Sequence, residues 1–306
     1  MLFSHDLQRI GNTPLVRLSG VERAYGLKTE LYAKLEECNP AGSVKDRAAM
    51  WMIRAAEEQG VLQKGGCVVE ATSGNTGIGL AYVCAARGYS FVAVMPETAS
   101  IERVKLMQAY GAEVILTAGA DGMSGSIEVA QKISRERNAY HPDQFSNPAN
   151  ARAHYESTGV ELYNDLPSVD VLVSGIGSGG TVSGTGKYLK EQNGKIAVIG
   201  VEPSNSPFLT QGKKGAHKIQ GIGAGFCPKT LDVAVLDEVL CVTDEDAYRY
   251  ARAVAKADGI FAGISSGAAL GGAIEYSLRV ENAGKKIAII FPDGGGRYLS
   301  TPNFVG

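Results

Sequence analysis

The sequence contains little of what several classes of protein require. No apolar run approaches the about 18 residues that a membrane-spanning helix needs, and the N-terminus lacks a basic segment followed by a long apolar stretch. Lys and Arg (30) nearly balance Asp and Glu (32), so the net charge of −2 gives no broad attraction for nucleic acid or acidic lipid. We therefore expect neither a membrane protein nor a nucleic-acid-binding protein, and we place the chain in the cytoplasm.

Cysteine and histidine are also scarce. The five cysteines are odd in number and show no C-x-x-C spacing, which argues against a disulfide framework and against a zinc site. None of the four histidines pairs with a carboxylate or a cysteine at metal-ligand spacing. The sequence therefore predicts a reducing compartment and no bound metal.

Glycine is the residue type in excess. It makes up 39 of the 306 residues, close to double the usual share of about 7%. Hydrophobic residues at 44% and charged residues at 20% are near the averages of folded proteins. We expect a folded protein in which backbone groups, rather than side chains alone, contact a ligand.

Short β-branched runs alternate with longer amphipathic stretches, and this order builds parallel sheets from βαβ units. Several of the runs are apolar at nearly every position, as strands covered on both faces should be. Strands are predicted at 31–35, 67–71, 91–95, 113–116, 169–173, 196–201, 238–242 and 287–291. Helices are predicted at 44–59, 76–87, 101–110, 125–137, 181–191, 244–257 and 266–279. The predicted fold class is α/β, with mainly parallel twisted sheets flanked by helices.

No low-complexity linker and no internal repeat divides the chain, so two domains of this length must abut closely. The polar segment 141–153, which contains Pro and Asn, is the weakest stretch, and we place the crossover there. We predict an N-terminal domain at 1–146 and a C-terminal domain at 147–306, with an early strand that crosses to the other domain.

A glycine-rich turn joins a predicted strand to a predicted helix at Gly175-Ile-Gly177-Ser-Gly-Gly180-Thr181. Without Cβ atoms the backbone N–H groups can converge on a ligand, and the helix N-terminus adds partial positive charge, so the turn suits a phosphate. Gly175, Gly177 and Gly180 also satisfy G-x-G-x-x-G, and Glu202 follows at about the distance of a ribose-binding acid. Taken alone, the turn is typical of a dinucleotide fold, and an NAD-dependent oxidoreductase stays open as an alternative.

A second strand-to-helix turn, Thr72-Ser-Gly-Asn-Thr76, carries four short hydrogen-bonding side chains in five residues. Hydroxyls and backbone N–H groups at a helix start are well placed to hold a carboxylate. An ordinary N-cap needs only one such residue. The excess favours a binding site over a cap.

A third cluster, Asn39-Pro-Ala-Gly-Ser-Val-Lys45-Asp46-Arg47, places cations in the first turn of a helix. The helix dipole opposes them there and should lower the lysine pKa, as a nucleophilic or basic amine requires. The alternatives are that Lys45 extends into solvent and that Asp46 neutralises the effect. A fourth turn, Gly263-Ile-Ser265-Ser266-Gly267, offers a neutral hydroxyl at a helix start or an N-cap serine.

Together these clusters resemble the cysteine synthase (O-acetylserine sulfhydrylase) family, in particular its A-type branch. That family has fold type II of the pyridoxal phosphate (PLP) enzymes, similar to the tryptophan synthase β subunit. The resemblance extends from about Ile10 to Thr301. It rests on five ordered motifs, Gly11-Asn-Thr-Pro-Leu-Val, Asn39-Pro-Ala-Gly-Ser-Val-Lys-Asp-Arg, Thr72-Ser-Gly-Asn-Thr-Gly, Gly177-Ser-Gly-Gly-Thr and Gly263-Ile-Ser-Ser-Gly.

The resemblance implies roles for individual residues. Lys45 would be the catalytic residue and form the internal aldimine, Asn75 would meet the ring 3′-oxygen, and Ser265 the pyridine nitrogen. The residues that would hold the cofactor phosphate are Gly177, Ser178, Gly179, Gly180 and Thr181. The residues that would bind the substrate are Thr72, Ser73, Gly74, Asn75, Thr76 and Gln144 at its carboxylate and Gly223 at its amino group.

The implied reaction forms L-cysteine and acetate from O-acetyl-L-serine and sulfide through an α-aminoacrylate. A neutral serine does not favour a protonated pyridine nitrogen, and the restrained electron sink suits β-elimination over transamination. An O-phosphoserine sulfhydrylase, a cystathionine β-synthase-like enzyme and a paralogue without activity stay open. The resemblance also implies a homodimer and allows a serine acetyltransferase tail as partner.

Two departures from the family pattern stand out. Ser178 occupies a position where many members have Thr, which keeps the hydroxyl. Gly294-Gly-Gly296 replaces a segment that commonly carries Glu just before Arg297, and this puts the packing of the C-terminal loop in doubt.

Overall fold

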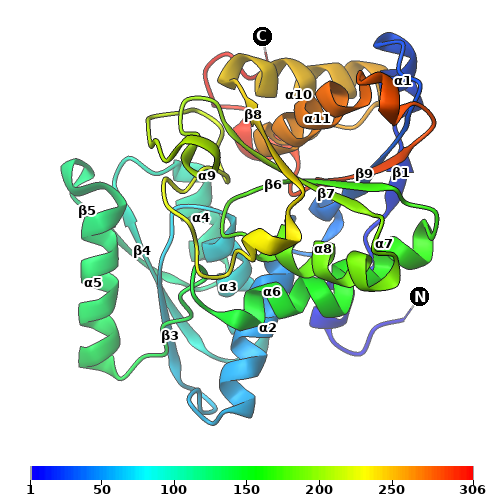
Figure 1. The fold of residues 1–306 in the computed structure, drawn as a ribbon. Helices are drawn as coiled ribbons and strands as arrows, with labels where there is room; N and C mark the ends of the chain where they lie inside the picture. Colours follow the sequence, from blue (N-terminus) through cyan, green and yellow to red (C-terminus); the bar gives the residue numbers. More distant parts are fainter. Residues whose placement is uncertain (1, 306) are drawn as a thin grey trace. The chain divides into compact units, whose positions relative to one another are not determined.

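The computed structural model describes residues 2–305 and contains two compact units (Figure 1). Unit 1 is Met1–Ile10 with Asn39–Asn150, and unit 2 is Gly11–Cys38 with Ala151–Gly306. The chain passes from unit 1 to unit 2 after Asn150, inside the segment 141–153, whereas we predicted the boundary after residue 146. No helix in the described range is long and apolar enough to cross a membrane.

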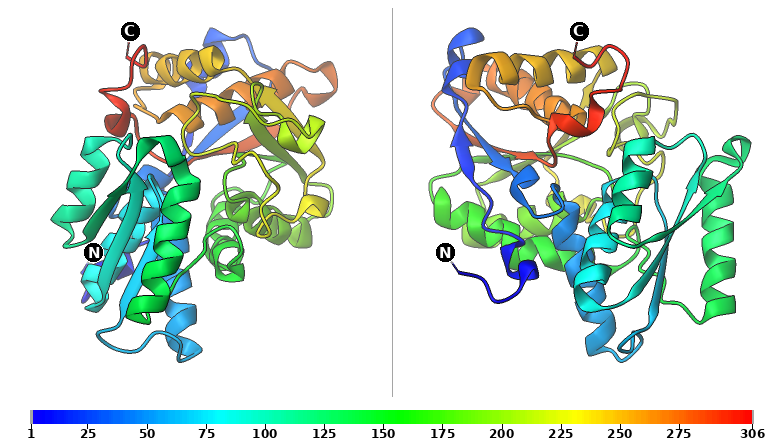
Figure 2. Two further views of the ribbon diagram at one scale, coloured as in Figure 1. Left: turned by 90° about the vertical axis from the view of Figure 1, so that its left-hand side faces the viewer. Right: turned by 180° about the vertical axis from the view of Figure 1, so that it is seen from behind.

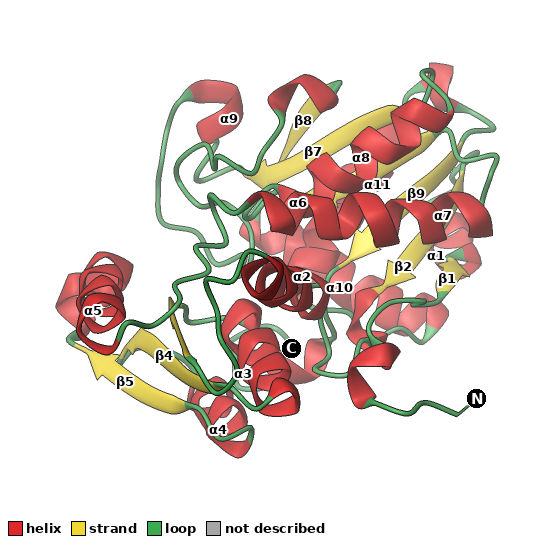
Figure 3. Cartoon of the chain, turned by 90° about the horizontal axis from the view of Figure 1, so that it is seen from below, coloured by secondary structure: helices red, strands yellow, loops and turns green. Residues whose placement is uncertain are grey.

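Unit 1 is built on a three-stranded parallel sheet in the order β3 (Cys67–Ala71), β4 (Ser90–Pro96) and β5 (Glu113–Thr117). One face is covered by α5 (Gly122–Arg137). The helices on and behind the other face, seen end-on in Figure 3, are α2 (Lys45–Glu58), α3 (Asn75–Arg87) and α4 (Ile101–Ala109).

The strands of unit 1 are apolar on both sides because both faces of the sheet are covered. Along β3, Val69 packs with Ala130 of α5, while its neighbour Val68 packs with Leu80 of α3. Successive residues of a strand point to opposite faces, so a strand between two helical layers needs apolar residues at every position.

Unit 2 contains a six-stranded sheet in the order β1-β2-β9-β6-β7-β8, in which only β1 runs antiparallel to its neighbour. Its strands are β1 (Leu15–Arg17), β2 (Glu30–Leu35), β6 (Val171–Gly175), β7 (Ala197–Pro203), β8 (Glu238–Val242) and β9 (Lys286–Phe291). Its helices are α1 (Ser19–Ala24), the C-terminal part of α6 (Pro148–Ala153), α7 (Gly159–Asp165), α8 (Gly180–Gln192), α9 (Phe208–Gln211), α10 (Asp244–Asp258) and α11 (Ile264–Ser277).

Helices cover both faces of this second sheet as well. Helix α11 packs on one face with α10 behind it, and α8 packs on the other with α7 beside it (Figure 2). Val171 and Val173 of β6 share a cluster with Ala269 of α11, whereas Leu172 packs with Leu189 of α8. The layers therefore repeat in unit 2 the arrangement of unit 1.

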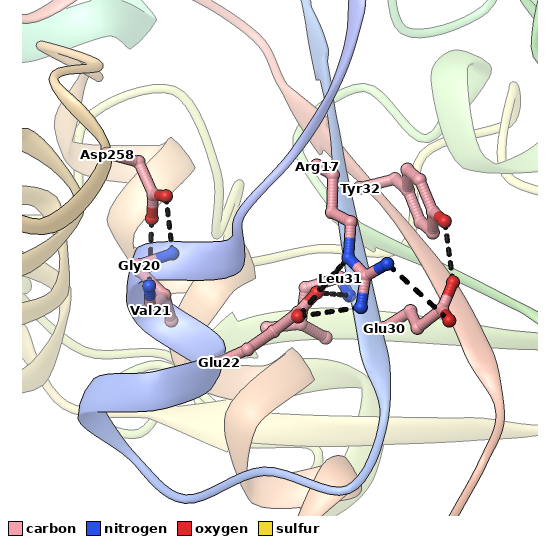
Figure 4. Close-up of polar contacts among 8 residues, drawn as sticks. All are labelled: Arg17, Gly20, Val21, Glu22, Glu30, Leu31, Tyr32 and Asp258. Carbon is pink, nitrogen blue, oxygen red and sulfur yellow. Dashed lines mark hydrogen bonds and ion pairs between the residues drawn. The ribbon is translucent and has the colours of Figure 1, made fainter.

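Within unit 2, polar contacts that Figure 4 shows join the early segment Gly11–Cys38 to the end of α10. The Asp258 carboxylate accepts hydrogen bonds from the N–H groups of Gly20 (2.6 Å) and Val21 (2.9 Å) at the start of α1. Gly20 is required here, because a Cβ would lie 2.2 Å from the Ala257 carbonyl oxygen. The α1 N-terminus is thus capped by the end of α10 rather than by its own N-cap residue.

The structure confirms the α/β class with mainly parallel sheets and each of the eight predicted strands and seven predicted helices, with end points that shift by a few residues. The sequence analysis missed β1, α1, α6, α7 and α9. Each of these is only three to seven residues long, too short for a hydrophobic period to repeat.

Candidate functional site

Lys45 is the first residue of α2 and is half-buried. The turn before it is held by Asp46, which is 0% exposed and accepts hydrogen bonds from the Ala41 N–H (2.6 Å) and the Ser43 hydroxyl (3.5 Å). The Lys45 N–H donates to the Ser43 Oγ at 3.2 Å. The carboxylate that could have neutralised Lys45 is therefore engaged by the turn that positions it.

Gly79 brings the start of α2 close to α3. A Cβ at Gly79 would lie only 3.0 Å from the Lys45 carbonyl oxygen, closer than ordinary contacts allow. Gly79 follows Asn75 by four residues, about one helical turn. The Lys45 backbone consequently lies about one turn from the Thr72–Thr76 loop, and two of the predicted clusters come together in unit 1.

The Thr72–Thr76 loop connects β3 to α3, as predicted. Thr72 Oγ1 accepts hydrogen bonds from the N–H groups of Gly74 (3.4 Å) and Gly77 (3.2 Å), and this leaves its hydroxyl hydrogen for a ligand. Thr72 and Thr76 are buried, while Ser73, Gly74 and Asn75 are half-buried. The Thr72 side chain therefore caps the start of α3 through its oxygen while its own hydroxyl hydrogen is not used within the loop.

Gln144 joins this loop although it is far away in sequence. The Thr76 hydroxyl donates to Gln144 Oε1 at 2.6 Å, and the Gln144 carbonyl oxygen accepts from Asn150 Nδ2 at 2.8 Å. Within residues 2–305, no hydrogen bond uses Gln144 Nε2 as a donor. The amide can therefore donate to an anion at the start of α3.

Two residues beside this loop escaped the sequence analysis as functional candidates. Glu70, near the end of β3, is buried, and its Oε1 lies 3.6 Å from His141 Nε2. Burial raises the pKa of Glu70, and the nearby Glu70 carboxylate raises the pKa of His141. The two residues lie far apart in sequence, so no local spacing signals the pair.

The glycine turn of unit 2 connects β6 to α8 and requires its glycines. A Cβ at Gly177 would lie 2.3 Å from the Gly221 carbonyl oxygen. Gly179 has a φ of +86°, and a Cβ there would lie 2.6 Å from Leu231 Cβ. Gly180 then begins α8, so crowded backbone and a helix N-terminus meet at this turn, which suits a phosphate.

Ser178 and Thr181 complete the turn and are buried. The Ser178 carbonyl oxygen accepts a short hydrogen bond from the Thr230 hydroxyl. Thr181 Oγ1 lies 3.2 Å from His154 Nε2, and His154 Nδ1 lies 2.9 Å from Thr158 Oγ1. His154 is thus a hydrogen-bonded core histidine that holds the first turn of α8.

Ser265 and Ser266 differ in what they contact, although they are neighbours in the first turn of α11. Ser266 donates to the Asp293 carbonyl oxygen at 3.2 Å. Ser265 is only 3% exposed, and no other described residue makes a hydrogen bond with its hydroxyl. The N-cap of α11 is Gly263, so Ser265 does not cap the helix either. Its hydroxyl is the one in this turn that a ligand can use.

The loop that contains Gly223 lies against both of these turns. Gly223 has a φ of +71°, its N–H donates to the Ile176 carbonyl oxygen (2.9 Å), and its carbonyl oxygen lies 3.0 Å from His217 Nε2. Gly221, with a φ of +98°, lies beside Ser265, since a Cβ there would be in ordinary contact with Ser265 Oγ at 3.6 Å. Unit 2 therefore brings Gly177, Gly223 and Ser265 together.

Glu202, the acid that a dinucleotide-binding fold would need for the ribose, is engaged by other groups in this structure. Glu202 is 2% exposed, and its carboxylate accepts hydrogen bonds from the N–H groups of Leu209 (2.9 Å) and Thr210 (3.0 Å) and from the Thr210 hydroxyl (2.6 Å). It caps the short helix α9 and is not available to a ribose. The contacts of Glu202 therefore do not support the oxidoreductase alternative, which depended on its spacing from the glycine turn.

The glycine turn before α8 and the first turn of α11 together fit a cofactor that presents a phosphate and a ring nitrogen. The crowded glycines offer backbone N–H groups with no side chain in the way, and Ser265 offers an unused neutral hydroxyl. Residues 7–293 match the family described as pyridoxal-phosphate dependent enzyme, and the chain belongs to that family.

More specific relatives are cysteine synthases. The cysteine synthase of Staphylococcus aureus (strain Mu50) is 47% identical over 297 residues, which are 96% of this chain and 95% of the relative. The crystal structure of the cysteine synthase from Entamoeba histolytica has a TM-score of 0.96 and 43% identity, covering 99% of this chain and 91% of that one. A hydrogen sulfide-producing enzyme from Fusobacterium nucleatum has a TM-score of 0.92 and 44% identity, covering 97% of this chain and 100% of that one.

The C-terminal departure from the family pattern has a local explanation at Gly294 and Gly295 but not at Gly296, directly before Arg297, where a Cβ would meet nothing within 4 Å. A Cβ at Gly294 would lie 2.2 Å from Glu37 Oε2, and a Cβ at Gly295 would lie 2.7 Å from the Phe261 ring. Burial, reinforced by the Asp293 carboxylate, raises the pKa of Glu37. Within unit 2 the Glu37 carboxylate occupies space that a side chain at residue 294 would need.

Proposed function

We propose that the chain is a PLP-dependent cysteine synthase that forms L-cysteine and acetate from O-acetyl-L-serine and sulfide. The observation that carries the proposal is the Ser265 hydroxyl, which is buried beside Gly221 and which no other described residue binds. When bound, PLP supplies an electron sink that lets a leaving group depart from the substrate β-carbon and a nucleophile take its place.

Residues of unit 2 are assigned to the cofactor. The backbone N–H groups of Gly177–Thr181 and the start of α8 bind the phosphate, because oriented N–H groups at a helix N-terminus favour an anion. Ser265 binds the pyridine nitrogen through a neutral hydroxyl, which does not stabilise a positive charge on the ring as a carboxylate would. This restraint favours elimination over transamination.

Residues of unit 1 are assigned to the amino acid. The Lys45 amine would hold the cofactor, and its Nζ would carry the proton of the substrate Cα. The start of α3, with Ser73, Asn75 and Thr76, holds the carboxylate together with Gln144 Nε2. Thr72 and Gly74 are assigned to the same carboxylate, the former through its hydroxyl hydrogen. Asn75 would also meet the ring oxygen, and Gly223 of unit 2 is assigned to the amino group.

The experiment is the visible absorption spectrum of the protein loaded with PLP, combined with mass spectrometry of the product. O-acetylserine should shift the cofactor band, sulfide should restore it, and cysteine should accumulate. Lys45→Ala should lower turnover by about 10³-fold or more, since it removes both the anchor and the proton carrier. Lys64→Ala, an exposed lysine of the same unit, is the matched control.

Three results would count against the assignment. A protein that stays colourless after PLP is added would refute the cofactor sites. Turnover in Lys45→Ala equal to that of Lys64→Ala would refute the role of Lys45. If homocysteine replaced sulfide with equal efficiency and gave cystathionine, the nucleophile would be misassigned.

We also propose a cytoplasmic homodimer that can bind the C-terminal tail of a serine acetyltransferase. The five cysteines are all free thiols, as a reducing compartment favours. The dimer and the tail rest on family membership. Light scattering should report twice the chain mass, and a synthetic tail peptide should compete with O-acetylserine. A monomer, or a peptide without effect, would contradict them.

A further inference from the structure

We infer that Glu70 and His141 are positioning residues that hold Gln144 against Thr76 and thereby set the affinity for the substrate carboxylate. The inference rests on the proposed function. It adds a side-chain pair that touches neither substrate nor cofactor but fixes a residue assigned to the substrate.

The pair stands where the segment that carries Gln144 joins the sheet. Tyr140 extends the sheet beside β3, since its N–H donates to the Cys67 carbonyl oxygen (2.8 Å) and its carbonyl oxygen accepts from the Val69 N–H (2.9 Å). Glu70 is 4% exposed, and both of its carboxylate oxygens contact the segment that follows Tyr140. Oε1 lies 3.6 Å from His141 Nε2, and Oε2 accepts from the Asp143 N–H at 2.9 Å.

Asp143 links the contact with Glu70 to the position of Gln144, the next residue in the chain. It has a φ of +49°, a backbone conformation that non-glycine residues rarely adopt, and its carbonyl oxygen accepts from the N–H groups of Ser146 (3.0 Å) and Asn147 (2.9 Å). Gln144 follows directly and is 8% exposed, with its Oε1 bound by Thr76. A shift of the Asp143 amide away from Glu70 would therefore move Gln144 relative to the start of α3.

The charge of His141 matters because Glu70 is buried. Burial raises the pKa of Glu70, and the ion pair with Glu70 raises the pKa of His141 above its usual value of about 6.5. The other titratable groups that act on the pair are the carboxylate of Asp143 and the phenol of Tyr140, whose pKa is raised by its own burial. Protonated His141 compensates the Glu70 carboxylate, and raising the pH through the His141 pKa removes that compensation.

The experiment compares KM and kcat for O-acetylserine in wild type, His141→Leu and His141→Gln, each loaded with PLP. His141→Leu should raise KM about tenfold with kcat changed less than about threefold, because a binding residue is displaced while the reacting groups stay. His141→Gln keeps a donor toward Glu70 and should recover most of the KM at neutral pH. His5→Gln, an exposed histidine of unit 1, is the matched control.

The pH profile separates positioning from a general loss of stability. The ratio of the wild-type KM to the KM of His141→Gln should rise between about pH 6 and 8, because His141 of wild type loses its proton in this range. Independently of activity, NMR titration of the His141 ring should give a pKa above the ordinary value, and Glu70→Gln should lower it. The ring titration reports the pair even if a variant loses turnover.

The outcomes are distinct from those that test the proposed function. If wild type makes no cysteine, the proposed function fails, whereas the NMR titration still tests the pair. If wild type is active and His141→Leu has unchanged KM, or loses kcat with KM unchanged, the inference is overturned. A His141 pKa that does not respond to Glu70→Gln overturns it as well.

Discussion

The two strand-to-helix turns that precede α3 and α8 have the same local topology but present their donors differently. In unit 1 the glycine of the turn is uncrowded, since a Cβ at Gly74 would meet no atom within 4 Å. In unit 2 the glycines are crowded, and a Cβ at Gly177 would lie 2.3 Å from the Gly221 carbonyl oxygen. The first turn therefore acts through side chains and the second through its backbone.

The difference matches the anions assigned to the two turns. A carboxylate is planar and can be oriented by a few side-chain donors such as those of Thr72 and Gln144. A phosphate spreads its charge over several oxygens and is held well by convergent N–H groups at a helix start. A glycine in such a turn therefore indicates a backbone binding site only when the atoms around it are known to leave no room for a side chain.

The largest expected effect is that of Gly177→Ala, which breaks the backbone turn. The new Cβ would collide with the Gly221 carbonyl oxygen, so the two loops must separate. We expect a loss of about 1–3 kcal/mol in the free energy of unfolding, as for overpacked sites. PLP affinity should fall about tenfold or more, measured by titration of the visible band.

Gly296→Ala in the same unit is the control for this change, because a Cβ there would meet nothing within 4 Å. Its unfolding temperature and PLP affinity should equal those of wild type. If Gly177→Ala bound PLP as tightly as Gly296→Ala, the backbone account of this turn would be wrong.

The comparison also shows what the sequence can and cannot predict. The long strands and helices were predictable because a repeated hydrophobic period records burial on one or both faces. Helix α1 was not, because its N-terminal N–H groups are capped by Asp258, a residue 238 positions away. Its stability comes from tertiary contacts rather than from local signals.

The candidate site divides in the same way. The order of the motifs predicted Lys45, Ser265 and both turns, because each of them lies in a short continuous stretch of sequence. The Glu70–His141 pair and the contact between Thr76 and Gln144 depend on how the chain returns to β3, and no spacing records that return. The roles assigned to these residues stay predictions that variants can test.

A smaller effect is expected for Thr76→Val, which removes a side-chain donor from the turn of unit 1. Gln144 Oε1 would lose its 2.6 Å hydrogen bond in a buried place, at a cost of about 1–2 kcal/mol. KM for O-acetylserine should rise about tenfold while PLP affinity stays unchanged. Thr76→Ser restores the hydroxyl and should restore KM. A fall in PLP affinity in Thr76→Val would show that the two turns do not act on separate anions.

The smallest effect is expected for Gly74→Ala, which tests whether the glycine of the unit 1 turn is needed for its backbone. Gly74 has extended dihedral angles (φ −134°, ψ −156°), and a Cβ would meet no atom within 4 Å. The free energy of unfolding should therefore change by less than about 0.5 kcal/mol, and PLP affinity should not change. By contrast, Gly77→Ala, in the first turn of α3, places a Cβ 2.7 Å from Thr72 Cγ2 and should destabilise by about 1–3 kcal/mol. Equal losses in the two variants, measured by thermal unfolding, would mean that crowding does not distinguish the glycines of this turn.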